Sequence, residues 1–193
     1  MRGHHLGNSL RSAGTAGIVS LEDSVAPTLF VSFIGWSRTG KTTFIVAALE
    51  ECRRRGIAVS AVKRARHEAD LAPEGKDSTL FLAAGARISV YIGDNTSVEF
   101  RRTPIEQGID FYSSFLSGEA FVFLEGPRFD GALTVLVAGA AKKPSDLKLP
   151  LSDCDILIAD DPPAFETADG GPRVFRPDAI GDFMDYLVEM RGT

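Results

Sequence analysis

The feature of this sequence that most constrains its fold is a glycine-rich loop set between a strand pattern and a helix pattern. Residues 29–35, LFVSFIG, form the β-branched and aromatic run that is typical of a buried strand. Gly35 and four further residues lead to Gly-Lys-Thr at 40–42, and residues 42–55 then place their apolar side chains on one helical face. This order of strand, loop and helix predicts a loop that binds phosphate groups.

The residue types in this loop suit phosphate binding for physical reasons. Glycine lets the backbone turn so that several N–H groups point inward, and the following helix adds the positive end of its dipole. We expect Lys41 to reach the outer phosphates of a nucleotide and the Thr42 hydroxyl to coordinate Mg²⁺. The predicted nucleotide contacts within the loop are Gly35, Ser37, Arg38, Thr39, Gly40, Lys41, Thr42 and Thr43.

The rest of the chain alternates strand and helix patterns. Further strands are predicted at 57–63, 88–93, 98–100, 121–126, 133–139 and 155–160. Further helices are predicted at 79–86 after a Ser78 cap, at 104–115 and at 177–190, with loops at 140–153 and 161–173. Because the strands are almost wholly apolar, the pattern predicts an α/β fold. It has a mostly parallel central sheet with helices on both faces, like that of phosphate-loop NTPases.

Length, charge and composition limit the remaining possibilities. The chain has 193 residues, which fits one nucleotide-binding domain over 29–193 after a flexible extension over 1–28 that is rich in Gly, Ser and Ala. The formal net charge of −5 argues against nucleic-acid binding, which requires a basic field. Two cysteines are too few for a disulfide framework, and no apolar run is long enough to span a membrane. We therefore expect a cytoplasmic protein.

Carboxylates that suit a metal ion end two of the predicted strands. Glu125 closes the run FVFLE, and Asp160 and Asp161 close the run ILIADD. Ligands of open α/β sheets bind at the carboxyl ends of the strands, so each group is a candidate for a Mg²⁺ site. The alternative is that these acids only end strands at turns, where acids are common.

A second concentration of polar chemistry follows the strand at 57–63. The cations there suit an anionic ligand, the acids suit water-mediated Mg²⁺ binding, and the histidine suits proton transfer or a ligand contact. A solvated loop is the better interpretation for any one of them alone, whereas their place beside the phosphate loop favours a nucleotide site. These residues are Lys63, Arg64, Arg66, His67, Asp70, Lys76 and Asp77.

Four blocks of the sequence resemble the MobB family, the adapter proteins of molybdopterin guanine dinucleotide biosynthesis. The phosphate loop alone is common to many proteins, but its combination with the GKDS, AGA and LEG segments is much more specific. The blocks are FIGWSRTGKTTFIVAALEECRRRG (33–56), VSAVKRARHEADLAPEGKDS (59–78) with AGA (84–86), FVFLEGPR (121–128) and RPDAIGDFMDYLVEM (176–190).

The resemblance implies a GTP-binding adapter with Mg²⁺, weak hydrolysis and a homodimeric state. It also implies partnership with the molybdenum cofactor guanylyltransferase and with apo-molybdoenzymes. By motif match, residues 35–43 would hold the phosphates, and Glu125, rather than the later aspartates, would lie near the metal. Lys63, His67 and Asp77 would lie near the nucleotide.

The chain departs from the family pattern in three places. Arg64 and Arg66 stand where the family has histidines, and Ala120 stands where an aspartate often precedes the Glu-Gly strand. Residues 127–139 also differ from the family, which leaves room for a changed partner.

The main alternative to an adapter is a small-molecule kinase of the same fold, in which residues 101–108 would form part of a lid. A switch GTPase is disfavoured because its Asn/Thr-Lys-x-Asp segment is absent, and a metallochaperone because Cys/His clusters are absent. No water-positioning glutamine or arginine finger is recognisable, which predicts slow turnover and leaves Arg38 and Glu125 as the possible catalytic residues. The preference for GTP over ATP rests on the resemblance alone.

Overall fold

The computed structural model describes residues 27–64, 77–101, 108–116, 118–126, 128–165 and 170–192. The predicted extension over 1–28 therefore lies almost wholly outside the described residues. Its last two residues already contact the folded body. The Thr28 hydroxyl donates to the Glu119 carbonyl at 2.8 Å, and Arg191 donates to the Pro27 carbonyl at 3.1 Å.

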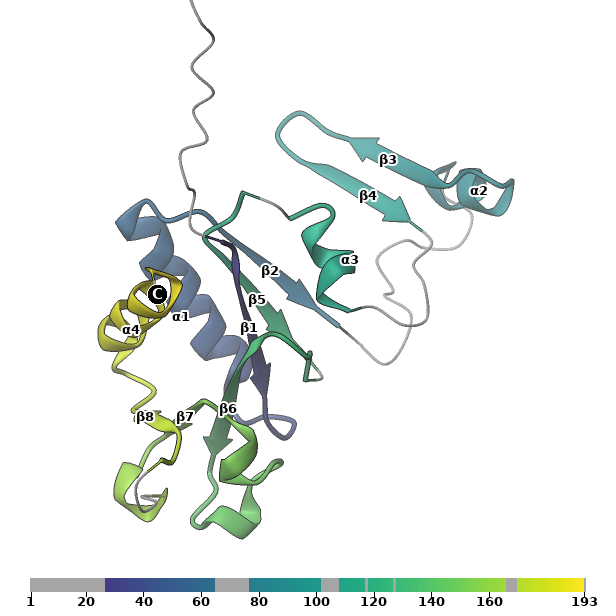
Figure 1. Ribbon diagram of the computed structural model, residues 1–193. Coiled ribbons are helices and arrows are strands. Elements are labelled where there is room, and N and C mark those ends of the chain that lie inside the picture. Colours follow the sequence, from purple (N-terminus) through teal and green to yellow (C-terminus); the bar gives the residue numbers. More distant parts are fainter. Residues whose placement is uncertain are drawn as a thin grey trace, which may run out of the picture.

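In the described part of the chain, six strands form a parallel central sheet (Figure 1), and every neighbouring pair is parallel. The predicted mostly parallel sheet is thereby confirmed. Only the last strand was not predicted: it begins at the final residue of the loop predicted over 161–173, and its three residues are too few to show a pattern. In spatial order the strands are β2 (Val59–Lys63), β5 (Phe121–Glu125), β1 (Leu29–Ile34), β6 (Leu133–Gly139), β7 (Ile156–Ala159) and β8 (Arg173–Phe175).

Helices lie on both faces of this sheet (Figure 1). On one face α1 and α4 pack together, and Arg55 of α1 forms ion pairs with Glu51 and with Asp185 of α4. On the other face lies the short α3. Within the described ranges no helix is long and apolar enough to cross a membrane. The bounds are α1 (Lys41–Arg55), α3 (Ile109–Ser113) and α4 (Ile180–Gly192), with 3₁₀ helices at Pro144–Asp146, Leu151–Asp153 and Pro162–Phe165.

Two of the predicted strands lie outside the main sheet. β3 (Ile88–Ile92) and β4 (Ser97–Arg101) pair antiparallel as a separate hairpin, against which α2 (Asp77–Ala83) packs (Figure 1). The prediction of Ser78 as the cap of this helix is wrong, because Ser78 is already its second residue.

The helix predicted over 104–115 is shorter than expected. α3 begins at Ile109, after Gly108, whose φ of −89° and ψ of −178° are extended. Glycine is a poor helix former, and the extended backbone of Gly108 means that α3 does not extend to residues before Ile109. Pro104 is therefore not the first residue of α3. Residues 102–107 lie outside the described residues.

The core follows from the alternation of side chains along the strands. Val31 and Phe33 of β1 belong to the cluster beneath α1 and α4, whereas Phe30 and Ile34 belong to clusters on the opposite face. Both faces of β1 are therefore buried, which explains why its sequence is a continuous apolar run rather than an alternating one.

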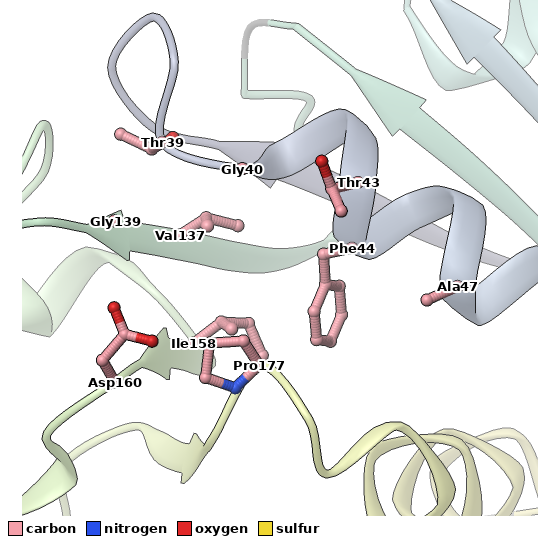
Figure 2. Close-up of a pocket in the computed structure, with 10 residues that line it drawn as sticks. All are labelled: Thr39, Gly40, Thr43, Phe44, Ala47, Val137, Gly139, Ile158, Asp160 and Pro177. Carbon is pink, nitrogen blue, oxygen red and sulfur yellow. The ribbon is translucent and has the colours of Figure 1, made fainter.

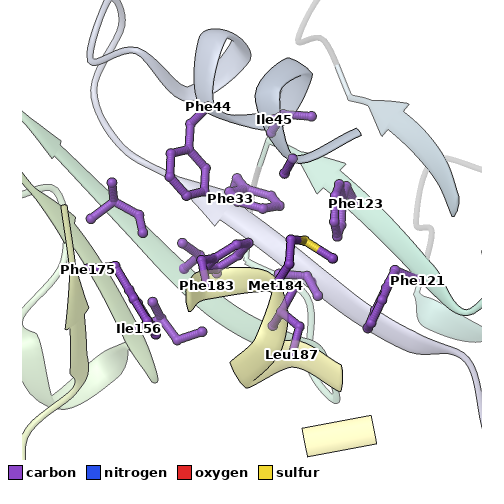
Figure 3. Packing of buried hydrophobic residues seen from close by; sticks show 14 of the residues in the cluster. Phe33, Phe44, Ile45, Phe121, Phe123, Ile156, Phe175, Phe183, Met184 and Leu187 are labelled. Carbon is purple, nitrogen blue, oxygen red and sulfur yellow. The ribbon is translucent and has the colours of Figure 1, made fainter. Parts of the chain in front are cut away.

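Aromatic rings join α1 and α4 to the sheet (Figure 3). Phe183 of α4 is fully buried and meets Phe44 of α1 edge-on, with ring centroids 5.0 Å apart. It meets Phe175 of β8 in the same way at 5.8 Å. These contacts hold the first turn of α1, and with it the end of the preceding loop, against the sheet.

The strand register brings two polar side chains to one edge of the sheet. Phe33, near the end of β1, pairs with Glu125 of β5, and Glu125 pairs with Lys63 at the end of β2. Because parallel strands end at the same edge, these side chains and the loop after β1 lie together. This is the edge at which ligands of open α/β sheets bind.

Replacing Phe183 with alanine is expected to lower the free energy of unfolding by about 3–5 kcal/mol, because it leaves a cavity between α4 and the sheet. Urea-induced unfolding followed by circular dichroism measures the change. Val188→Ala, on the exposed side of the same helix, is the control and is expected to cost about 0.5 kcal/mol or less. Equal losses for the two variants would contradict this assignment of the core.

Candidate functional site

The loop predicted to bind phosphate joins β1 to α1. A Cβ atom on Gly35 would lie 2.6 Å from the Val137 carbonyl oxygen, so only glycine fits there without displacing the backbone. Gly40 precedes α1 with a φ of 87°, a left-handed conformation that glycine adopts without strain. Arg38 has a φ of 64°, which is uncommon for a residue with a side chain. The loop therefore turns sharply into the N-terminus of α1.

The same loop rests on the end of β6. Gly139 has a φ of 60°, and a Cβ atom there would lie 2.8 Å from both Cα and Cβ of Thr39. Any side chain at this position would push Thr39 away from the sheet. Sequence reasoning missed this contact, because a glycine that ends an apolar strand carries no further local signal.

Lys41 folds back over the loop from the start of α1. Its Nζ atom donates to the carbonyl oxygens of Gly35 at 3.0 Å and of Trp36 at 2.6 Å. Burial lowers the pKa of Lys41 below its ordinary value, Glu125 opposes this shift, and two nearby lysines add to it. An anion beside Nζ would offset the cost of this burial by supplying the opposite charge.

A second lysine reaches the loop from a distant segment. Lys148 Nζ lies 3.4 Å from the Gly35 carbonyl oxygen, which Lys41 also contacts, and 6.0 Å from the centroid of the Trp36 ring. The Trp36 Nε1 atom in turn donates to the Asp146 carbonyl at 3.1 Å. Sequence reasoning missed Lys148, because only the path of the loop over 140–153 brings it to Gly35.

Thr42 meets Glu125 at the edge of the sheet. The Thr42 hydroxyl lies 3.0 Å and 3.1 Å from the two carboxylate oxygens, and Lys63 Nζ lies 3.6 Å from Oε1 of Glu125. A hydroxyl and a carboxylate are oxygen ligands of the kind that Mg²⁺ prefers, so their chemistry fits the predicted metal. No group of three or more His, Cys, Asp or Glu side chains gathers among the described residues. A Mg²⁺ ion here would therefore take further oxygens from water or a ligand.

These side chains line one groove. It encloses about 390 Å³, and it unites the predicted loop residues other than Gly35 with one residue from β2 and one from β5. Gly35 takes part through its carbonyl oxygen, which both lysines contact. The lining residues are Ser37, Arg38, Thr39, Gly40, Lys41, Thr42, Thr43, Lys63 and Glu125.

Of the other predicted residues, Arg64, Asp160 and Asp161 do not line this groove. His67 lies outside the described residues. Asp77 begins α2, which lies beside the hairpin and away from the loop between β1 and α1 (Figure 1). Asp160 lines a separate cavity at the ends of β6 and β7 (Figure 2), and Asp161 is a lining residue of neither space. Of the three carboxylates that end predicted strands, all of them within the described residues, Glu125 is the one that contacts Thr42.

The two cysteines are unsuited to nucleophilic chemistry. Cys52 in α1 and Cys154 before β7 are buried and free. Burial raises the pKa of each thiol to about 11, so almost no thiolate exists at neutral pH.

Comparison with known sequences indicates a family. The sequence model of MobB, described as molybdopterin guanine dinucleotide synthesis protein B, matches residues 30–142, more than half of the chain. The molybdopterin-guanine dinucleotide biosynthesis adapter protein of Escherichia coli (strain K12) is 27% identical over 123 residues, which are 61% of this chain and 70% of that protein. The protein of the same name from Haemophilus influenzae is 30% identical over 112 residues, 57% of this chain and 56% of that protein.

Solved structures agree on the fold. A crystal structure of molybdopterin-guanine biosynthesis protein B (mobB) matches with a TM-score of 0.61 at 25% identity, covering 86% of this chain and 100% of that one. Bacillus subtilis MobB matches with a TM-score of 0.62 at 21% identity, covering 84% and 97%. The resemblance to MobB is confirmed over residues 30–142, which contain three of the four sequence blocks, and the chain belongs to the MobB family, that of molybdopterin guanine dinucleotide synthesis protein B.

Proposed function

We propose that the protein is an adapter of molybdopterin guanine dinucleotide synthesis that binds GTP with Mg²⁺ and hydrolyses it slowly in the cytoplasm. The observation that carries the proposal is the groove in which Lys41, Thr42 and Glu125 converge from α1 and β5. Family membership supports the adapter role, because the relatives are named as adapter proteins of this synthesis. The choice of GTP rests on the family resemblance.

Two lysines and the loop backbone would hold the phosphates. The first N–H groups of α1 have no partner within the helix, and the helix dipole places positive charge at this end. Lys41 and Lys148 both contact the Gly35 carbonyl oxygen. On binding, their ammonium groups would exchange neutral carbonyl partners for phosphate oxygens, which form stronger charge-assisted hydrogen bonds.

Thr42 and Glu125 would hold Mg²⁺ together with the phosphates. The hydroxyl would bind the ion directly, and the carboxylate would bind it directly or through water. The ion would neutralise charge on the phosphate oxygens. Lys63, 3.6 Å from Glu125, would help to orient that carboxylate toward the groove by charge attraction.

Hydrolysis would be slow because Arg38, the arginine in the described part of the groove, is not held in one position. Arg38 lines the groove, and an arginine placed at that phosphate is worth roughly 10³–10⁵ in rate. Within the described residues, however, no hydrogen bond or ion pair orients the Arg38 side chain. We infer that a partner or a second copy is needed to order it.

The proposed partners are the molybdenum cofactor guanylyltransferase and apo-molybdoenzymes, with the protein acting as a homodimer. The hairpin supports the dimer, because a two-stranded hairpin is marginal in isolation and this one exposes apolar side chains on both faces. Seven of the twelve large apolar side chains found exposed among the described residues lie on α2, β3 and β4: Leu80, Phe81, Ile88, Val90, Tyr91, Ile92 and Val98. A second hairpin laid against one face would remove the apolar side chains of that face from water.

Lys41→Ala is expected to weaken GTP binding by at least about tenfold, because it removes a charge-assisted contact to the phosphates. Lys148→Ala is expected to weaken it by a smaller factor, and Glu125→Gln to reduce the gain in affinity that Mg²⁺ provides. Isothermal titration calorimetry with and without Mg²⁺ measures all three. Arg53→Ala, exposed near the far end of α1, is the control and is expected to leave binding unchanged.

The same protein samples distinguish the proposal from its rivals. Equal affinity for ATP and GTP would contradict the proposal that GTP is the preferred nucleotide. Rapid phosphate transfer to a small acceptor would indicate that the protein is a kinase rather than an adapter. If neither nucleotide binds, the phosphate-binding role of the loop is wrong.

Gly139→Ala is expected to weaken binding of GTP and of inorganic tripolyphosphate alike, because the added methyl group displaces Thr39 and the loop. Gly56→Ala is a matched control. Its φ of 68° imposes similar backbone strain, but nothing lies within 4 Å of the added Cβ. Urea unfolding is expected to show a similar loss of unfolding free energy for both variants, because the backbone strain is similar. Only Gly139→Ala is expected to bind the two ligands more weakly. Unchanged tripolyphosphate binding by Gly139→Ala would contradict the role given to this contact.

Ile92→Lys is expected to convert a dimer into a monomer, because it introduces charge at the most exposed apolar position of the hairpin. Ile92 is 77% exposed, so the change costs the isolated monomer little. Analytical ultracentrifugation over a concentration series measures the assembly. Val188→Lys, on α4, is the control at a second exposed apolar site. A wild-type protein that stays monomeric would contradict the proposed interface.

A further inference from the structure

A second cavity adjoins the phosphate-binding groove on the opposite side of the loop. It encloses about 290 Å³ between the N-terminus of α1, the ends of β6 and β7, and the segment that precedes α4 (Figure 2). Thr39, Gly40 and Thr43 line both spaces. A ligand whose phosphates lie in the groove can therefore extend past these residues into the cavity.

The wall of this cavity is mainly apolar. Phe44 and Ala47 face it from α1, Ile158 from β7, and Pro177 from the segment before α4 (Figure 2). Ligand pockets span roughly 300–1,000 Å³, so a space at the lower end of that range suits one part of a nucleotide rather than the whole. The flat base is the part of a nucleotide that gains most from apolar surroundings.

One charged side chain stands at the edge of the cavity. Asp160 follows β7 directly and is exposed, and it forms no hydrogen bond or ion pair within the described part of the chain. An ionised carboxylate only accepts hydrogen bonds. It repels phosphate, so this cavity does not suit the phosphate end of a ligand, and it attracts a pair of adjacent N–H donors.

We propose that this cavity binds the guanine base of the nucleotide and that Asp160 determines the preference for guanine by accepting hydrogen bonds from its N1–H and 2-amino groups. The inference rests on the proposed nucleotide binding in the adjoining groove. Guanine offers two neighbouring donors on this edge, which match the two oxygens of one carboxylate. Adenine offers one amino donor beside the acceptor N1, so a carboxylate there faces a lone pair instead of a hydrogen.

The test changes both the base of the nucleotide and the side chain at position 160. Xanthine carries an oxygen where guanine carries its 2-amino group. The amide NH₂ of the Asp160→Asn variant can donate a hydrogen bond to this oxygen of xanthine. With guanine, the same NH₂ faces the 2-amino group, and two donors form no hydrogen bond. Wild-type protein is expected to bind GTP at least about tenfold more tightly than XTP or ATP, and Asp160→Asn is expected to prefer XTP over GTP. Calorimetry with Mg²⁺ gives the six dissociation constants. A reversal of preference cannot arise from misfolding.

Two further variants sharpen the result. Asp161→Asn changes the neighbouring exposed aspartate, which does not line the cavity, and is expected to keep the wild-type ratio of GTP to XTP affinity. Ala47→Leu adds bulk to the cavity wall from α1 with a residue that favours helix. It is expected to weaken GTP binding several-fold while the affinity for inorganic tripolyphosphate, which lacks a base, stays unchanged.

The outcomes separate this inference from the proposed function. If GTP binds in a Lys41-dependent way and Asp160→Asn leaves the affinities for GTP and for XTP both unchanged, the base lies elsewhere and the proposed function stands. If Asp160→Asn weakens GTP, XTP and ATP by the same factor, the carboxylate contacts the sugar and the assignment to the base is overturned. If no nucleotide binds the wild-type protein, the proposed function fails and this inference fails with it.

Discussion

The site depends on one constraint, the close approach of the loop after β1 to the neighbouring strand β6. Gly35 lies against the Val137 carbonyl, and Gly139 lies against Thr39, at distances that exclude a Cβ atom on either glycine. Because β1 lies between β5 and β6, the loop faces Glu125 on one side and the apolar cavity on the other. The arrangement of the whole site follows from that position.

Charge distinguishes the two sides of the loop. Lys41 and Lys148 converge on one carbonyl oxygen, and Lys63 lies beside Glu125, so cations concentrate where phosphates would bind. The cavity beyond Thr43 is apolar apart from the carboxylate of Asp160 and the short side chains of the loop. A nucleotide has the same asymmetry, with an anionic end and a flat base that bears N–H donors. Electrostatics would therefore set its orientation across the loop.

Much of the secondary structure was predictable because its signals are local. The continuous apolar runs of β1, β5 and β6 and the helical periodicity of α1 depend only on neighbouring residues. The hairpin shows what local sequence patterns do not predict. Its strands were predicted, but their separation from the main sheet was not, because pairing is decided between segments. The start of α3 was wrong for a related reason, since the pattern of the predicted helix continued across Gly108 although its backbone is extended.

The sequence by itself determined the glycine-rich loop between β1 and α1, because Gly35, Gly40, Lys41 and Thr42 lie within eight residues and the flanking strand and helix follow from local patterns. It also indicated the family, through short blocks that the comparison confirmed. Only the tertiary structure decided that Glu125 contacts Thr42, 83 residues away, and that Lys148 reaches Gly35 across 113 residues. The strand order of a parallel sheet brings such segments to one edge, and that order depends on how the strands pack rather than on the residues beside any one of them.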